Sequence, residues 1–175
     1  MKTVRIYPLK NLSLTQFRRL RDAQMEAAQV WNLCMQMHRD ARMQHEIWPG
    51  SDELQKATKG QFALHSQSVQ MVVHIFLANI DTTRQLRQTH SQMHMSYPYK
   101  NKRFYPVTWP KQAVHRKENR VVLPMGRGRT SLVLPLALPE NSGACTLVWN
   151  KGFEFACVHG GRASRERTRG QACHR

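Results

Sequence analysis

Acidic side chains decide first what chemistry this chain can perform, because two-metal cleavage of a phosphodiester needs closely placed carboxylates. Asp81 is the last aspartate of the 175-residue chain. The acidic residues after it are Glu118, Glu140, Glu154 and Glu166, and no two of them are near each other in the sequence. We therefore expect no catalytic residues, and we expect that the chain is not an enzyme.

Cysteine and histidine also lack the spacing of a metal site. The cysteines are Cys34, Cys145, Cys157 and Cys173. They are far apart and form no C-x-x-C pair, which argues against a zinc ribbon or a disulfide framework. A weaker alternative is a zinc site made from Cys157, His159, Cys173 and His174. We expect no metal and no cofactor.

The charge of the chain indicates its partner. There are 27 Lys and Arg residues against 11 Asp and Glu, giving a formal charge of +16 and an isoelectric point near 10.6. Such a balance is typical of proteins that bind polyanions, and nucleic acid is the first candidate. No apolar run approaches the roughly 18–20 residues of a membrane span, and the first ten residues lack the apolar core of a signal peptide. We expect a cytoplasmic protein that does not bind membranes.

Hydrophobic periodicity divides the chain into strand, helices and strands. Residues 2–9 alternate as a short strand. Ser13 and Gln16 then form a capping box, and apolar residues at helical spacing predict a long helix that ends before Trp48. A short helix should follow from Ser51 to about Lys59, and a second long helix should begin at His65 or Ser66. The first strand is therefore assigned to residues 1–11 and a helical lobe to residues 12–95.

Aromatic and basic side chains alternate in residues 96–111, a composition that suits stacked bases and backbone phosphates. The same aromatic residues could instead cap a small barrel. Strands are expected at 120–125, 131–138, 145–149 and 153–158, separated by Gly- and Pro-containing turns. Strands of this kind are typical of a small antiparallel barrel or sandwich over residues 96–159. The N-terminal strand should join them, with the helices inserted after it. The Arg-rich residues 160–175 should be disordered, or alternatively form an arm that folds on RNA.

Several short sequence words occur together in one order. They are R-I-Y-P near the N-terminus, V-W-N at residues 30–32, L-H-S-Q-S-V-Q at 64–70, Y-P-Y-K-N-K at 97–102 and R-V-V-L-P at 120–124. In this order the words resemble TnpB, the OrfB-type, insertion-sequence-encoded family of RNA-guided nucleases related to type V CRISPR effectors. The resemblance covers about residues 2–159. It implies an α+β fold in which a wedge-type β-barrel carries an inserted α-helical recognition lobe.

The chain departs from that family at its C-terminal side. In TnpB proteins a RuvC nuclease domain follows, with its catalytic carboxylates and a four-cysteine zinc ribbon, and none of these is present here. We therefore expect a truncated, nuclease-less TnpB-like protein that binds guide RNA, DNA or both. Two alternatives remain. The chain could be one half of a split or frameshifted endonuclease completed by a separately encoded RuvC chain, or it could be a simple helix-turn-helix DNA-binding regulator without a guide RNA.

The resemblance also implies sites. In TnpB-like proteins a recognition-lobe helix that begins with an S-Q-x-x-Q segment lies beside the short DNA motif that the protein recognises. The matching residues of this chain are Ser66, Gln67 and Gln70. A glutamine amide can pair bidentately with adenine in the major groove. In the wedge region the candidates for the guide-RNA backbone are Lys100, Lys102, Arg103 and Lys111. The outer face of the first helix carries Arg18, Arg19, Arg21, Arg39 and Arg42. The high net charge makes Arg18, Arg19 and Arg21 candidates for an RNA or DNA backbone as well, and the alternative is an ordinary solvated face. Candidates for base stacking, or for the core, are Tyr97, Tyr99 and Trp109.

Overall fold

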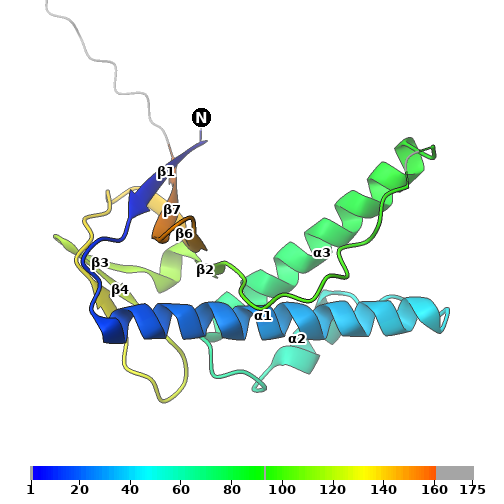
Figure 1. The fold of residues 1–175 in the computed structure, drawn as a ribbon, viewed down its shortest axis with the longest axis horizontal. Helices are drawn as coiled ribbons and strands as arrows, with labels where there is room; N and C mark the ends of the chain where they lie inside the picture. Colours follow the sequence, from blue (N-terminus) through cyan, green and yellow to red (C-terminus); the bar gives the residue numbers. More distant parts are fainter. Residues whose placement is uncertain (1, 93, 161–175) are drawn as a thin grey trace, which may run out of the picture.

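The computed structural model describes residues 2–92 and 94–160, which form three α-helices and two antiparallel sheets (Figure 1). The mixed α+β class expected from the sequence is therefore confirmed. Helix α1 (Leu14–Met43) runs along the molecule, and the strands gather around its N-terminal end. The expected Arg-rich tail lies outside the described residues, apart from Gly160, which ends the last strand.

Helix α1 begins where the sequence predicted it. The Ser13 hydroxyl accepts a hydrogen bond from the Gln16 amide at 3.1 Å, and the Gln16 side chain accepts one from the Ser13 amide at 2.9 Å. Because this capping box satisfies two amide groups that the helix itself leaves unpaired, it fixes the first turn. The helix buries the predicted stripe from Leu20 to His38.

Two further helices pack against α1. They are α2 (Ser51–Thr58) and α3 (Ser66–Thr89), with His65 as the N-cap of α3. Ser66 is therefore the first helical residue and not the cap. The buried side of α3 is the predicted one and includes Val69, Val72, Val73, Phe76 and Ile80. Among the described helices, none combines the length and the apolar character that crossing a membrane requires.

The strands form two sheets. Strands β1 (Lys2–Pro8), β7 (Phe153–Gly160), β6 (Ser142–Trp149) and β2 (Val107–Trp109) make a four-stranded sheet in that order. Strands β3 (His115–Lys117), β4 (Arg120–Leu123) and β5 (Leu132–Leu134) make the other. The N-terminal strand lies antiparallel to the last one, with Val4 opposite Val158. The helices therefore enter the chain between two strands of one sheet, as the periodicity predicted.

Neither sheet closes into a barrel, so the closed barrel expected from the sequence is not formed by the described residues. Proline is one reason, since it lacks the amide that a strand ladder needs. Pro124 directly follows β4, and Pro135 directly follows β5, which leaves only three residues of the strand expected at 131–138. Strands β2 and β3, each of three residues, were not expected.

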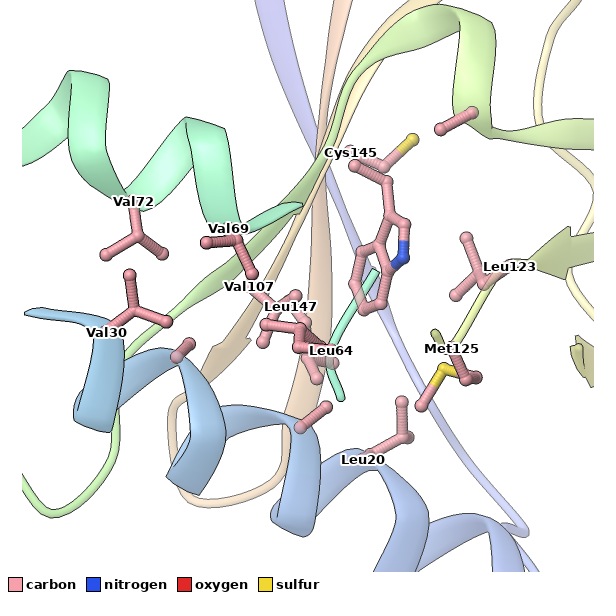
Figure 2. Packing of buried hydrophobic residues seen from close by; sticks show 14 of the residues in the cluster. Leu20, Val30, Leu64, Val69, Val72, Val107, Leu123, Met125, Cys145 and Leu147 are labelled. Carbon is pink, nitrogen blue, oxygen red and sulfur yellow. The ribbon is translucent and has the colours of Figure 1, made fainter. Parts of the chain in front are cut away.

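One hydrophobic core joins the helices to both sheets (Figure 2). Leu20 from α1 and Val72 from α3 belong to the same buried cluster as Leu123 from β4 and Leu147 from β6. Trp109 of β2 is also in this cluster, is fully buried, and donates its indole N–H to the Pro124 carbonyl at 2.9 Å. The helical part and the strand part are therefore packed as one unit.

Candidate nucleic-acid interface

A groove of about 950 Å³ lies between α2, the start of α3 and the loop that contains Gly126. We call it the α2–α3 groove. Its cationic side chains are Lys56, Lys59 and Arg127, and Asp52 is the acidic one. The excess of positive charge, together with the positive end of the α3 dipole, favours an anionic ligand.

Two of the three predicted motif-reading residues lie in this groove. Ser66 and Gln70 both line it, and both are exposed. They are four residues apart and therefore share one face of the helix. Gln67 is partly buried and is not among the groove residues. The structure thus brings Ser66 and Gln70 together and separates Gln67 from them.

Gly126 sets one wall of the groove. Its φ is +122°, a conformation that side-chain-bearing residues rarely adopt. A Cβ atom at this position would lie 1.7 Å from the Ala63 carbonyl oxygen. Glycine therefore allows the loop carrying Arg127 to approach the chain just before α3. This contact joins residues far apart in the sequence.

A histidine in the groove is uncharged near neutral pH. His65 lines the groove directly before α3. Burial lowers the pKa of His65 below its ordinary value, and this effect exceeds the opposite effect of its hydrogen bond with Gln67. The positive charge of the groove at pH 7 is therefore provided by Lys56, Lys59 and Arg127.

The three arginines predicted to contact a backbone on α1 have different environments. Arg18 is exposed. Arg19 donates a hydrogen bond to the Thr130 carbonyl, so part of its guanidinium is already occupied. Arg21 forms an exposed ion pair with Asp22 at 3.1 Å. Arg18 is thus the least constrained of the three for binding a phosphate.

The predicted basic residues of the wedge region lie elsewhere. Lys100, Arg103 and Lys111 are exposed, and Lys102 is partly buried. Lys102 is held against α1 at Asn32 by hydrogen bonds to its backbone. Asn32 is eleven residues beyond Arg21, which at 1.5 Å per residue corresponds to about 16 Å along the helix. The α1 arginines and Lys102 therefore belong to separate parts of the surface.

The three candidates for base stacking also lie in different environments. Trp109 is a core residue, because its fully buried ring has no face available to a base. Tyr97 and Tyr99 are partly buried, and their ring centroids are 5.8 Å apart. The Tyr99 hydroxyl lies 2.7 Å from Nδ1 of His38, and Arg42 lies over the Tyr97 ring with its guanidinium carbon 4.7 Å from the ring centroid.

Sequence reasoning missed several residues of these surfaces. Lys56, Lys59 and Arg127 line the groove. Trp48 and Arg87 contact Tyr97, and Arg84 lies over Trp48. One sequence feature was informative, because the G-R-G-R turn at 126–129 has glycine at two positions of positive φ. The other residues come together only through the tertiary fold.

No protein-family model matches the chain, and no curated protein sequence matches it.

Proposed function

We propose that this protein is a nucleic-acid-binding protein that resembles the wedge and recognition lobes of TnpB, without the catalytic carboxylates of a RuvC nuclease in these 175 residues. The observation that supports the proposal is unneutralised charge. The sequence has 27 Lys and Arg against 11 Asp and Glu. Among the described residues only two ion pairs are found, Arg21 with Asp22 and Arg129 with Glu26. Most Lys and Arg side chains of the described residues are therefore not neutralised by an acidic side chain and can pair with phosphates, and this pairing releases counterions from the nucleic acid.

In this proposal the α2–α3 groove contacts duplex DNA. Gln70 and Ser66 provide polar groups for base edges, and Lys56, Lys59 and Arg127 lie around them as phosphate contacts. This combination of base-edge and phosphate contacts is the usual arrangement for sequence recognition. The α3 helix is anchored in the core by Val69 and Val72, so its first turn is presented by a rigid element.

The guide RNA is assigned to the exposed basic residues on either side of the buried strand β2, within residues 100–111. Lys100, Arg103 and Lys111 are exposed there, and the backbone of Lys102 is fixed to α1. A fixed backbone favours binding because less conformational freedom is lost when the RNA docks. We also propose that the surrounding strands correspond to the wedge domain of TnpB.

A simple helix-turn-helix regulator is the less favoured alternative. Residues 59–65 connect α2 to α3, and this connection is longer than the 3–4-residue turn of that motif. The other alternative, half of a split endonuclease, differs from the proposal only in needing a separate RuvC chain. Mixing the purified protein with such a chain and assaying guided cleavage distinguishes the two.

The proposal is tested by measuring affinity for RNA and duplex DNA as a function of salt. The logarithm of the association constant should fall with the logarithm of salt concentration by about 0.7 to 0.9 per neutralised phosphate. Replacing Lys100, Lys102 and Arg103 together by Ala should make this slope shallower for RNA. If the slope is unchanged, the RNA surface lies elsewhere, and if no binding is detected at low salt, the proposal is wrong.

A second experiment addresses nuclease activity and RNA identity. With Mg²⁺ or Mn²⁺, the purified protein should leave single- and double-stranded DNA intact. Metal-dependent cleavage that co-elutes with the protein would contradict the proposal. Sequencing the RNA that co-purifies with the protein then identifies the guide, while a regulator without a guide should yield no enriched RNA species.

A further inference from the structure

Three arginines of α1 and α3 lie over aromatic rings. The segment that follows α3 runs back from the end of that helix towards α1 (Figure 1). Arg42 of α1 and Arg87 of α3 have their guanidinium carbons 4.7 Å and 5.1 Å from the Tyr97 ring centroid. The Arg84 guanidinium lies 4.6 Å from the Trp48 ring centroid. Trp48 and Tyr97 are themselves in edge contact, with centroids 5.6 Å apart. We call these five residues the arginine–aromatic cluster.

Two guanidinium groups of the cluster, those of Arg42 and Arg84, are the more available to a ligand. Arg42, Arg84 and Arg87 are exposed, and none of them forms an ion pair within the described part of the chain. Arg87 donates a hydrogen bond to the Met95 carbonyl at 3.0 Å, so part of its guanidinium is already occupied. A guanidinium is planar, so when one face rests on an aromatic ring the opposite face points away from it. The ring also restricts the side chain, which reduces the entropy lost when a ligand binds.

Exposed apolar surface lies next to these cations in the sequence. Ile47, which precedes Trp48, is 96% exposed, and Met43, which follows Arg42, is 71% exposed. Planar cations match the chemistry of a nucleotide, which has a flat base and an anionic phosphate. An acidic peptide would need the charges but would make no use of the guanidinium planes.

Electrostatic repulsion makes it unfavourable to hold three cations close together, and an anionic ligand would reduce this repulsion. Each cation–π contact at an exposed site contributes only weakly to stability. The positive charges of Arg42 and Arg84 also disfavour protonation of His38, which lies between Trp48 and Tyr99. A bound phosphate neutralises this repulsion, and a stacked base uses the free guanidinium faces.

We propose that the arginine–aromatic cluster binds unstacked bases of single-stranded nucleic acid, with Arg42 and Arg84 as planar stacking platforms. The bases of a duplex are stacked on each other, so only single-stranded segments present both faces of a base. This inference rests on the proposed function and makes it specific, because it assigns single strands to a surface distinct from the α2–α3 groove.

The experiment compares oligouridylate and oligothymidylate with abasic oligomers of equal length and charge. The full-length wild-type protein should prefer each base-bearing oligomer by roughly 5- to 150-fold, the range corresponding to one stacked base. The double variant R42K/R84K keeps both positive charges but replaces both planar guanidinium groups by ammonium groups. It should bind the abasic oligomers as wild type does and lose most of the preference for bases.

The matched control is R5K/R120K, which changes two exposed arginines that do not lie over an aromatic ring in the described structure. It should keep the full preference. Comparing the uridine and thymidine oligomers shows whether RNA or DNA is the stronger ligand. Thermal unfolding of both variants confirms that they are folded.

Three results would overturn the inference. One is equal wild-type affinity for base-bearing and abasic oligomers, which leaves the proposed function intact because the protein still binds nucleic acid. Another is an R42K/R84K variant that retains the preference. The third is competition by polyglutamate as strong as competition by oligouridylate, which would identify the cluster as a site for acidic peptides. Failure of the wild-type protein to bind any oligomer at low salt would instead contradict the proposed function itself.

Discussion

The side chain of Asn32 forms two hydrogen bonds with the backbone of Lys102. Its Nδ2 donates to the Lys102 carbonyl at 2.9 Å, and its Oδ1 accepts from the Lys102 amide at 2.8 Å. The Lys102 ammonium lies 5.9 Å from the Trp31 ring centroid, and Trp31 stacks on Tyr105 with centroids 4.7 Å apart. The segment that follows α3 is thereby fixed along the middle of α1.

Replacing Asn32 by Ala should therefore destabilise the protein. The change leaves a backbone donor and acceptor of Lys102 without partners, at a cost of about 1–3 kcal/mol. Urea unfolding measures the effect. The control is Asn101→Ala, an exposed position beside Lys102, which should change the free energy of unfolding by less than about 0.5 kcal/mol. Equal effects at the two positions would show that the Asn32 contact does not stabilise the fold.

Gly126→Ala should disturb the α2–α3 groove. Alanine at a φ of +122° is strained, and its Cβ would overlap the Ala63 carbonyl, so we expect a loss of more than about 1 kcal/mol in the free energy of unfolding. Gly152→Ala is the control, since no atom lies within 4 Å of a Cβ there. The loss should appear in urea unfolding of the first variant and be absent from the second.

Gln70→Ala tests sequence recognition in the groove. After a preferred DNA motif has been selected from a random library, the variant should lose roughly 1–3 kcal/mol of discrimination between motif and non-motif duplexes at one fixed salt concentration. Non-specific affinity should be nearly unchanged. Gln88→Ala, an exposed glutamine near the other end of α3, should keep the discrimination. If Gln70→Ala also keeps it, another residue recognises the motif.

The buried His38 should make stability depend on pH. Burial, with smaller contributions from the charges of Arg42 and Arg84, lowers its pKa from 6.5 to about 4. Between these two values the unfolded chain binds more protons than the folded protein. The free energy of unfolding should therefore be highest above about pH 6.5 and decrease towards pH 4, by an amount on the order of 3 kcal/mol from this residue.

A His38→Gln variant isolates that contribution. Glutamine has no proton to gain in this range, so urea unfolding of the variant between pH 7 and pH 4 should show a smaller decrease. Some decrease should remain, because burial also lowers the pKa of His65 and of His159. If wild type and variant show the same pH profile, His38 is not responsible.

Cys145 and Cys157 should form a disulfide under oxidising conditions. They lie opposite each other on β6 and β7, with the two Sγ atoms 3.1 Å apart. The hydrogen bond from Cys157, with a smaller contribution from the Arg116 charge, lowers the pKa of Cys145. This favours the thiolate that begins thiol–disulfide exchange. Excess oxidised glutathione should therefore convert the pair to a disulfide, releasing two glutathione molecules for each bond.

Intact mass measurement in a Cys173→Ser background checks this prediction. The mass of the protein should decrease by that of two hydrogen atoms, and two fewer thiols should be alkylated. Cys34 on α1 should remain a thiol, because burial raises its pKa to about 12, whereas the pKa of Cys145 is lowered. A further Cys145→Ser change should abolish the mass loss. If all three thiols are still alkylated after oxidation and unfolding, the pair does not form a disulfide.

The helices could be predicted from the sequence because their determinants are local. The Ser13 cap and the apolar spacing from Leu20 onward define α1, and both are contained within a few helical turns. The short strands were harder. Strand β2 has only three residues, between Pro106 and Pro110, and all three are buried. Their burial results from the sheet and helices that cover the strand, so no local alternation of apolar and polar residues marks it in the sequence.

The candidate surfaces were predicted only in part for a related reason. The S-Q-S-V-Q segment allowed Gln70 to be predicted as a site residue. Arg127 could not be predicted, because it reaches the groove only through the contact between Gly126 and Ala63. The arginine–aromatic cluster likewise combines Trp48, Arg84 and Tyr97 from three separate parts of the chain. Single-sequence periodicity contains no information about such pairings.

The pairing of β1 with β7 determines when this sheet can form during synthesis. Lys2 lies opposite Gly160 and Pro8 opposite Glu154, so β1 must wait for almost the whole described chain before it finds its partner. The helices need only local contacts and can form earlier. Until β7 leaves the ribosome, Val4 and Ile6 lack their neighbouring strand, and they remain about 60% exposed even in the folded protein. A nascent chain interrupted before residue 153 would present an unpaired apolar strand, the kind of segment that chaperones recognise and that promotes aggregation.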